Sequence, residues 1–212
     1  MLMQHLIHLF WEQIKATTWL EWFAVIASVA EVLLAKKNNI WLYPTGILGI
    51  LAGSILLLES SLYAETVLNA YYLVMSMYGW VHWIKRRNEP PVKISNSNRQ
   101  EWGITLVITF VGWAVLYVLL KHFTNSNVPV WDSFVSSSAW AGMWLLARRK
   151  TENWILLNIS NLFAIPLLFY KQLPLMALLT LFLFIVAIFG YIDWLRILKK
   201  ERAETVSIST AS

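Results

Sequence analysis

The sequence predicts an all-α membrane protein with seven transmembrane helices, arranged as two parallel three-helix bundles joined by a linker helix. Three observations predict this fold: apolar runs of membrane-spanning length, a one-sided distribution of basic residues, and an internal repeat. Hydrophobic residues make up 58% of the 212-residue chain, and charged residues make up 14%. Soluble domains carry about 25% charged residues. The charges gather in short clusters between the apolar runs, so a bilayer explains the composition better than a soluble core does.

The elements follow in chain order. Residues 1–18 are expected to form an amphipathic helix at the membrane interface, because they lack the basic start and small-residue cleavage site of a signal peptide. Seven apolar segments follow, each close to the roughly 20 residues that cross a hydrocarbon core of about 30 Å. They are residues 19–35, 41–58, 64–83, 102–120, 131–147, 154–170 and 173–195. Most begin or end with Trp or Tyr, which favour the headgroup level of a bilayer.

The segments divide the chain into six parts. After the interfacial segment come a first bundle, a polar loop, a linker helix, a second bundle and a polar tail that we expect to be mobile. These parts are residues 19–85, 86–101, 102–122, 131–197 and 198–212.

The basic residues predict the orientation. With seven spans, 14 Lys and Arg residues fall on one side of the membrane and three, Lys15, Lys121 and Lys171, fall on the other. Short loops rich in Lys and Arg stay in the cytoplasm. We therefore expect a multi-pass protein of the bacterial inner membrane, with its N-terminus outside and its C-terminus in the cytoplasm.

The chain repeats itself at a spacing of about 112 residues. Residues 33–41 read LLAKKNNIW and residues 145–154 read LLARRKTENW. Residues 77–85 read MYGWVHWIK and residues 188–196 read IFGYIDWLR. Three helices and one linker separate the copies, so both enter from the same side and are parallel. Paired bundles of this kind are typical of transporters.

Polar residues inside the spans are the candidate binding residues, because they cost free energy unless they face a partner or a cavity. Asn69, Tyr72 and Ser76 lie on one helix face, and Trp154, Asn158 and Asn161 lie on another. Trp140 is a further aromatic candidate. An amide beside an aromatic ring suits a flat ligand with hydrogen-bonding edges. The alternative is that the amides join neighbouring helices, at about 0.6–2 kcal/mol each.

Two carboxylates have more than one interpretation. Glu31 lies well inside an apolar run and is a candidate for coupling or gating through a bound cation or proton, or for pairing with Lys36 or Lys37. Asp132, near the outer end of its segment, is expected to cap that helix.

Several function classes are excluded or disfavoured. The chain has no Cys, and its four His residues, His5, His8, His82 and His122, lack metal-site spacing, so we expect no metal and no cofactor. No phosphate-binding loop or nucleophile motif is present, so we expect no enzyme. The basic residues lie at helix ends, which indicates topology rather than nucleic-acid binding.

Four stretches, WLYPTGILG (41–49), LYAETVLNAYYLVMSMYGW (62–80), WDSF (131–134) and ARRKTENW (147–154), together resemble the PnuC family of bacterial vitamin transporters. The resemblance covers residues 20–197. It implies two parallel three-helix bundles like those of SWEET proteins, a homotrimer in membrane lipid, and facilitated diffusion of nicotinamide riboside. A separate cytoplasmic kinase would trap the vitamin for pyridine nucleotide biosynthesis.

The resemblance also implies binding roles for Asn69 and Trp154. Relatives commonly carry a second Trp where this chain has Leu157, followed by an Asn at the place of Asn161, and Asn158 is extra. Three alternatives stay open: a thiamine transporter of the same family, a vitamin-binding membrane sensor that passes nothing, and proton-coupled transport through Glu31.

Overall fold

The computed structural model describes residues 2–59, 63–85 and 93–211, and eight helices make up most of that part. They are α1 (Leu2–Ala16), α2 (Trp19–Lys36), α3 (Leu42–Glu59), α4 (Tyr63–Lys85), α5 (Arg99–Phe123), α6 (Pro129–Ala147), α7 (Asn153–Tyr170) and α8 (Pro174–Ala211). Each of the seven expected segments corresponds to one helix, and their ends agree within three residues except at the end of α8.

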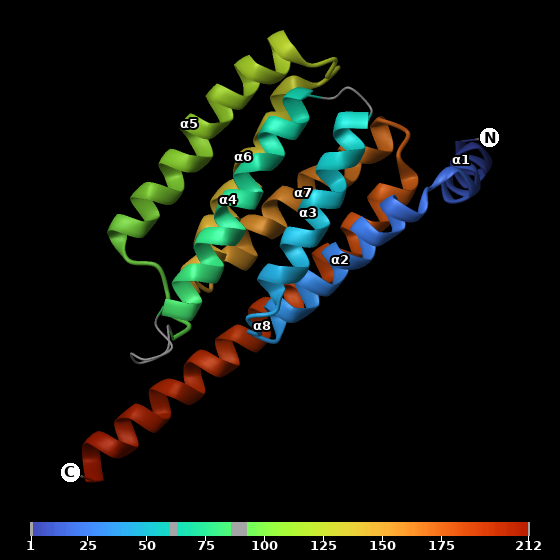
Figure 1. Cartoon of the computed structure of the whole chain (residues 1–212). Helices are drawn as coiled ribbons and strands as arrows, with labels where there is room; N and C mark the ends of the chain where they lie inside the picture. Colours follow the sequence, from blue (N-terminus) through green and yellow to red (C-terminus); the bar gives the residue numbers. More distant parts are fainter. Residues whose placement is uncertain (1, 60–62, 86–92, 212) are drawn as a thin grey trace.

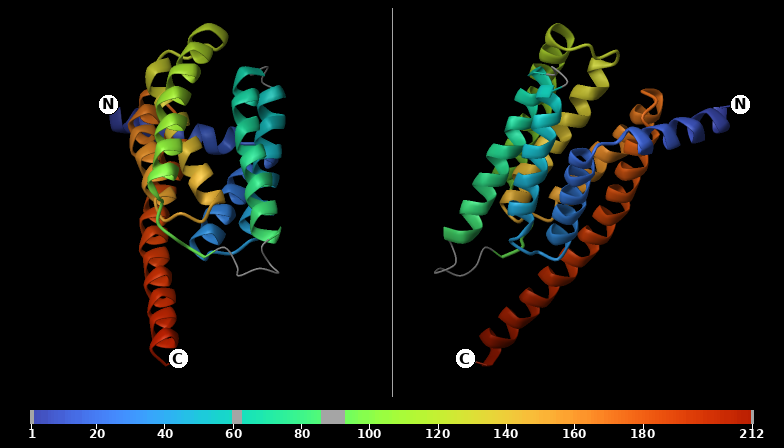
Figure 2. Two further views of the ribbon diagram at one scale, coloured as in Figure 1. Left: turned by 90° about the vertical axis from the view of Figure 1, so that its left-hand side faces the viewer. Right: turned by 45° about the vertical axis from the view of Figure 1, so that its right-hand side comes forward.

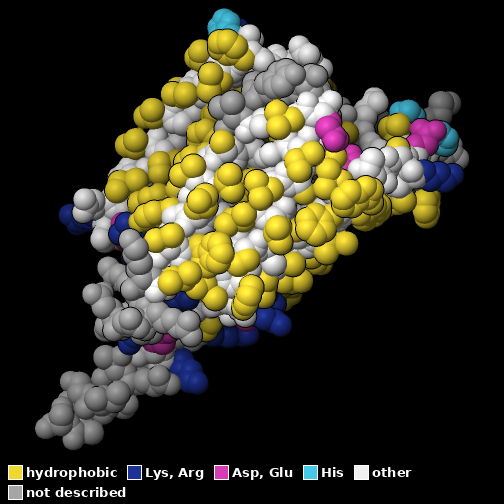
Figure 3. All heavy atoms as spheres, viewed as in Figure 1, with side chains coloured by type: hydrophobic (Ala, Val, Ile, Leu, Met, Phe, Trp, Pro, Cys, Tyr) yellow, Lys and Arg dark blue, Asp and Glu magenta, His cyan; other side chains and the backbone are white. Residues whose placement is uncertain are grey.

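Membrane-spanning character is strongest in four helices. By length and hydropathy, α3, α5, α7 and residues 174–203 of α8 are each able to cross a bilayer, and α1 with α2 makes a fifth when the bent pair is taken together. Exposed hydrophobic side chains cover the flanks of the molecule (Figure 3), as expected of a surface that faces lipid. The all-helical membrane architecture is thus clear, whereas the count of seven spans stays a prediction.

The segment that was expected at the membrane interface forms α1, which meets α2 at an angle of 105°. The break falls at Thr18, whose side chain accepts a hydrogen bond from the backbone N–H of Glu21, while the Glu21 side chain accepts one from the N–H of Thr18. This capping box starts α2 in a new direction. As a result α1 projects away from the other helices (Figures 1 and 2).

The C-terminal tail is helical. Helix α8 continues to Ala211, beyond the apolar segment that ends at residue 195, and extends past the other helices (Figure 1). Mobility of the segment after Leu198 stays a prediction. The tail is polar, yet residues 198–211 contain no Gly or Pro and several good helix formers, so nothing in them ends the helix.

The helices form two groups of three with the same order of packing. Helix α3 packs against α2 and α4, and α7 packs against α6 and α8. Between the groups, α4 packs against α6 and α2 packs against α8. A two-fold axis that exchanges α2 with α6 and α4 with α8 would turn the α4–α6 contact into the α2–α8 contact. The internal repeat predicts this relation. The linker α5 packs almost entirely against α6 and touches α4 only slightly.

One end of the molecule carries most of the Lys and Arg side chains (Figure 3), and we call it the basic end. Helices α2 and α6 finish there and α5 begins there, capped by Asn98 together with Glu101. The carboxylate of Glu101 pairs with Arg148 (3.2 Å) and Lys150 (3.0 Å) in the α6–α7 turn. The start of the linker is therefore fastened to the second bundle.

The buried core lies mostly at the basic end, where helix termini from both bundles meet. Its members are Ala35, Leu42, Tyr43, Trp83, Ile94, Leu146, Trp154, Ala187, Trp194 and Leu198. Four of these are large aromatic residues, so the basic end is closed by close packing.

Candidate functional site

Two tryptophans join the bundles at the basic end in the same way. The indole N–H of Trp83, on α4, donates to the carbonyl oxygen of Ala147 at the end of α6 (3.1 Å). The indole N–H of Trp194, on α8, donates to the carbonyl oxygen of Ala35 near the end of α2 (2.9 Å). The tryptophans match in the repeat, and so do the alanines of LLAKK and LLARR. The guanidinium of Arg149 lies over the Trp83 ring at 3.6 Å.

The structure shows a further match within the repeat. Tyr43 packs edge-on against Trp83 and its ring contacts Gly79, while Trp154 packs edge-on against Trp194 and its ring contacts Gly190. The counterpart of Trp154 is therefore Tyr43, although the two turns that precede these aromatics differ in length.

The α7 face predicted from the sequence starts in this core. Trp154 is 1% exposed and is packed between α7 and α8, whereas Asn158 and Asn161, one and two turns further along α7, are only partly buried. The indole N–H of Trp154 and the amide oxygen of Asn158 are buried without a hydrogen-bond partner among the described residues. Since buried polar groups are nearly always paired, these two atoms are candidates for contacts to a ligand or water.

On α4, the predicted residues behave differently from one another. The side-chain amide of Asn69 donates to the hydroxyl of Ser54 (3.0 Å) and the carbonyl of Ile50 (3.4 Å), both on α3. It therefore joins two helices, as in the alternative interpretation, and only its remaining hydrogen-bonding capacity is available to a ligand. Tyr72 is partly buried, and its ring lies edge-on to that of Tyr71 (6.2 Å).

Tyr71 is a further candidate that the sequence analysis did not include. Its ring stacks on Trp140 of α6, with ring centres 4.3 Å apart, and its hydroxyl donates to the Trp140 carbonyl (3.1 Å). Trp140 was predicted as a candidate, and its own indole N–H is buried without a partner. The stacked pair lies where the two bundles meet. The YY pair in LNAYY was the available signal, but helix spacing alone favoured the second tyrosine.

Further polar side-chain atoms are buried without a hydrogen-bond partner in the described residues. Those that lie within helices belong to Tyr43, Ser76, Ser138, Trp140, Asn153, Trp154 and Asn158. They come from α3, α4, α6 and α7, and Ser76 was part of the predicted α4 face. Buried polar groups are normally paired, so these atoms are candidates for contacts to water or to a polar solute.

The two carboxylates do not pair as expected. Lys36 pairs with Asp193 of α8 (3.5 Å) and not with Glu31, whose carboxylate lies against Gly46. Asp132 does not cap α6, because that helix begins at Pro129; its carboxylate accepts hydrogen bonds from Lys171 (2.6 Å).

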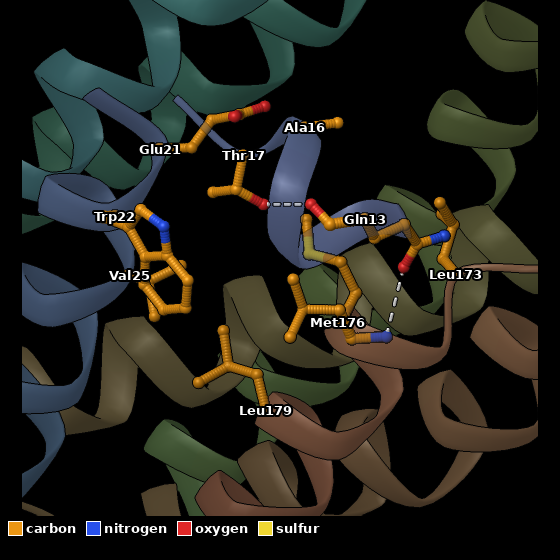
Figure 4. Close-up of a pocket in the computed structure, with 10 residues that line it drawn as sticks. Gln13, Ala16, Thr17, Glu21, Trp22, Val25, Leu173, Met176 and Leu179 are labelled. Atoms are coloured by element: carbon orange, nitrogen blue, oxygen red, sulfur yellow. Dashed lines mark hydrogen bonds between the residues drawn. The ribbon is translucent and has the colours of Figure 1, made fainter. Parts of the chain in front are cut away.

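Three pockets of the described surface lie elsewhere. The first, about 300 Å³, lies between α1, α2 and α8 and is lined by Gln13, Trp22 and Met176 among others (Figure 4). The Gln13 amide there bonds to Gln172 and Leu175, which fastens α1 to the start of α8. The other two flank α6–α7 and α3–α4. None is lined by the six predicted binding residues, so the predicted site is not one of these surface pockets.

Comparison with protein-family models matches residues 18–196 to the family described as nicotinamide mononucleotide transporter. The chain is similar to the nicotinamide riboside transporter PnuC of Escherichia coli (22% identical, 90% of each chain). It is also similar to the transporter of that name from Neisseria mucosa (24% identical, 88% of this chain and 76% of the relative). A crystal structure described as the vitamin B3 transporter PnuC superposes with a TM-score of 0.69, at 22% identity, over 94% of this chain and 90% of that one.

Proposed function

The chain belongs to the nicotinamide mononucleotide transporter family of membrane proteins, and we propose that it takes up nicotinamide riboside across the bacterial inner membrane. The observation that carries the proposal is the pair of symmetry-related bundles whose interior holds unpartnered polar atoms. Two relatives named as nicotinamide riboside transporters support this substrate.

The proposed topology has seven spans, with the N-terminus outside. The basic end is then cytoplasmic, since Lys and Arg concentrate on the cytoplasmic side. Close packing of the aromatic core at that end supports a conformation closed to the cytoplasm. Substrate would enter from the opposite end, between the bundles.

The proposed substrate site comprises Asn69, Tyr72, Trp140, Trp154, Asn158 and Asn161. To these we add Tyr71, because its ring is stacked on Trp140 between the bundles. Nicotinamide riboside is a pyridinium cation that carries a carboxamide and a ribose. Aromatic faces hold a desolvated cation by roughly 1–2 kcal/mol, and Asn side chains both donate to and accept from the carboxamide and the hydroxyls.

The site would exclude the phosphorylated form of the vitamin. The four helices that supply the unpartnered atoms hold no Lys or Arg between their end residues, so none of them pairs a phosphate at mid-membrane depth. Burying an unpaired dianion costs several kcal/mol. Phosphorylation by a cytoplasmic kinase would then trap the vitamin, and facilitated diffusion would suffice for net uptake.

The proposed assembly is a homotrimer surrounded by lipid. The outer face of α5 carries exposed Val107, Phe110, Val111 and Val118, which need either lipid or a neighbouring copy to cover them. Both partners are compatible with this apolar face.

A thiamine transporter is the second candidate, because thiamine is also an aromatic cation and the amides would serve it equally well. Titration of the purified protein by calorimetry with each vitamin separates the two. Saturable heat with nicotinamide riboside alone is the expected result. Saturable heat with thiamine alone would change the proposed substrate to thiamine and would leave the fold assignment unaffected.

Flux into liposomes tests transport itself. Labelled nicotinamide riboside should equilibrate across the membrane without exceeding the outside concentration. Binding without flux would indicate a sensor. Accumulation driven by an imposed pH gradient, and lost in Glu31→Gln, would indicate proton coupling.

A further inference from the structure

Glu31 brings a carboxylate into the first bundle, where it lies against a glycine of the neighbouring helix. The residue lies on α2, five positions before Lys36, and its carboxylate lies against Gly46 of α3. A Cβ atom on Gly46 would be 2.5 Å from one carboxylate oxygen and 2.6 Å from the carboxylate carbon. A side chain at position 46 would therefore require the Glu31 carboxylate to move.

The carboxylate is directed toward the interior of the molecule. Gly46 is buried and lies one turn after Tyr43, so both are on the same face of α3. Tyr43 is 1% exposed and belongs to the core, in contact with Trp83 of α4. Because Glu31 packs on this face, its carboxylate lies between α2 and α3 on the side of the core.

In the described part of the chain, Glu31 has no hydrogen bond and no ion pair. The nearest lysine along the helix, Lys36, pairs with Asp193 instead, and Lys37 is exposed at the helix end. An ionised carboxylate inside a membrane protein normally faces a partner charge or a polar cavity. A cationic ligand would supply the missing partner.

The second bundle has a related contact that holds no carboxylate. Leu157 lies three residues after Trp154, as Gly46 lies three after Tyr43, and Leu157 packs on Gly142 of α6. There the large side chain comes from α7 and the glycine from α6, whereas in the first bundle the large side chain, Glu31, comes from α2. Because Gly46 and Leu157 hold equivalent positions in the repeat, we place Glu31 at a similar height in its bundle to Asn158, the neighbour of Leu157, whose amide oxygen has no partner in the described residues.

We propose that Glu31 is the counter-ion of the substrate, which makes the site select an aromatic cation over an uncharged ring of the same shape. This inference rests on the proposed function and adds to it the residue that recognises positive charge. One unit charge within several ångströms in a partly polar interior is worth roughly tenfold in affinity or more.

The test compares two ligands of nearly equal shape and different charge. Nicotinamide riboside is cationic, and its 1,4-dihydro form is neutral. Calorimetry with the purified full chain should show tighter binding of the cation by the wild type. In Glu31→Gln, affinity for the cation should fall roughly tenfold or more, while affinity for the neutral form should stay within about twofold.

Two variants serve as controls. Glu31→Asp keeps the charge and should recover most of the preference for the cation. Glu12→Gln makes the same chemical change on the exposed surface of α1 and should leave both affinities unchanged.

Equal weakening of both ligands in Glu31→Gln, or no change in either, would overturn the counter-ion role and leave the transport proposal intact. Equal affinity of the wild type for the two forms would also overturn it. A wild type that binds neither form would refute the proposed substrate itself. The two failures are therefore distinguishable.

Discussion

The indole N–H of Trp83 donates a hydrogen bond to the carbonyl oxygen of Ala147, which lies 64 residues further along the chain and in the other bundle. Trp194 and Ala35 form the matching bond in the opposite direction. Together they join the first helix of each bundle to the last helix of the other at the basic end. Any motion that separates the bundles at this end must break them.

We expect Trp83→Phe and Trp194→Phe to lower stability by similar amounts. Each substitution keeps an aromatic ring and removes the indole donor of one hydrogen bond between the bundles, at a cost of about 1 kcal/mol. The measurement is thermal unfolding of the purified protein in detergent. Trp41→Phe is the matched control, because Trp41 is 64% exposed and should change little. A clear loss in one tryptophan variant and none in the other would contradict the symmetric role.

Asn158→Ala should abolish or strongly reduce uptake without loss of thermal stability. Its amide oxygen has no partner in the described structure, so its removal breaks no observed bond of that atom. Asn69→Ala should instead lower the free energy of unfolding by about 1 kcal/mol, because Asn69 bonds to α3. Wild-type uptake in both Asn158→Ala and Asn161→Ala would refute the α7 part of the site.

Tyr71→Phe and Tyr72→Phe form a matched pair of hydroxyl deletions on adjacent residues. The Tyr71 hydroxyl bonds to the Trp140 carbonyl across the two bundles, so its loss should cost about 1 kcal/mol of stability. The Tyr72 change should affect substrate affinity more than stability. Titration calorimetry and thermal unfolding of both variants check this. A loss of stability in Tyr72→Phe and a loss of affinity in Tyr71→Phe would contradict these roles.

Gly190→Ala should destabilise the protein by roughly 1–3 kcal/mol through overpacking. A Cβ atom there would lie 2.7 Å from the Trp154 ring, which is buried between α7 and α8. Gly103→Ala is the control, since no atom lies within 4 Å of its added Cβ, and the change should be neutral or slightly stabilising. Unfolding midpoints of the two variants give the answer, and equal midpoints would show that Trp154 is able to move aside.

Hydropathy predicted the helices because apolar length is read from the local sequence, and the repeat predicted their grouping into two sets of three. The orientation inferred from the charges stays a prediction. Apolar length sets where a helix can begin and end, and repeated letters such as those around Trp83 and Trp194 reveal equivalent positions. The continuation of α8 beyond residue 195 was not predicted, because hydropathy marks only the apolar part of a helix, although the polar part holds no residue that breaks a helix.

The site was less predictable, because tertiary contacts decide which polar residues remain free. Asn69 and Asn158 are similar in sequence context, yet one finds Ser54 as a partner and the other has an unpartnered oxygen. The stack of Tyr71 on Trp140 joins α4 to α6. The residue pattern of a single helix does not show how two helices are rotated against each other, so this contact could not be predicted. The salt bridge of Asp132 with Lys171 likewise joins α6 to a turn far along the chain.

Because α5 packs on only one bundle, it adds a fourth helix to the second bundle and leaves the first bundle with three. The linker packs along α6, and Glu101 at its start is held by Arg148 and Lys150, whereas α4 scarcely touches it. In a transport cycle the second bundle and the linker would move together as one rigid unit. The first bundle, which carries Glu31, would move relative to that unit, so the proposed counter-ion of the substrate would move with it.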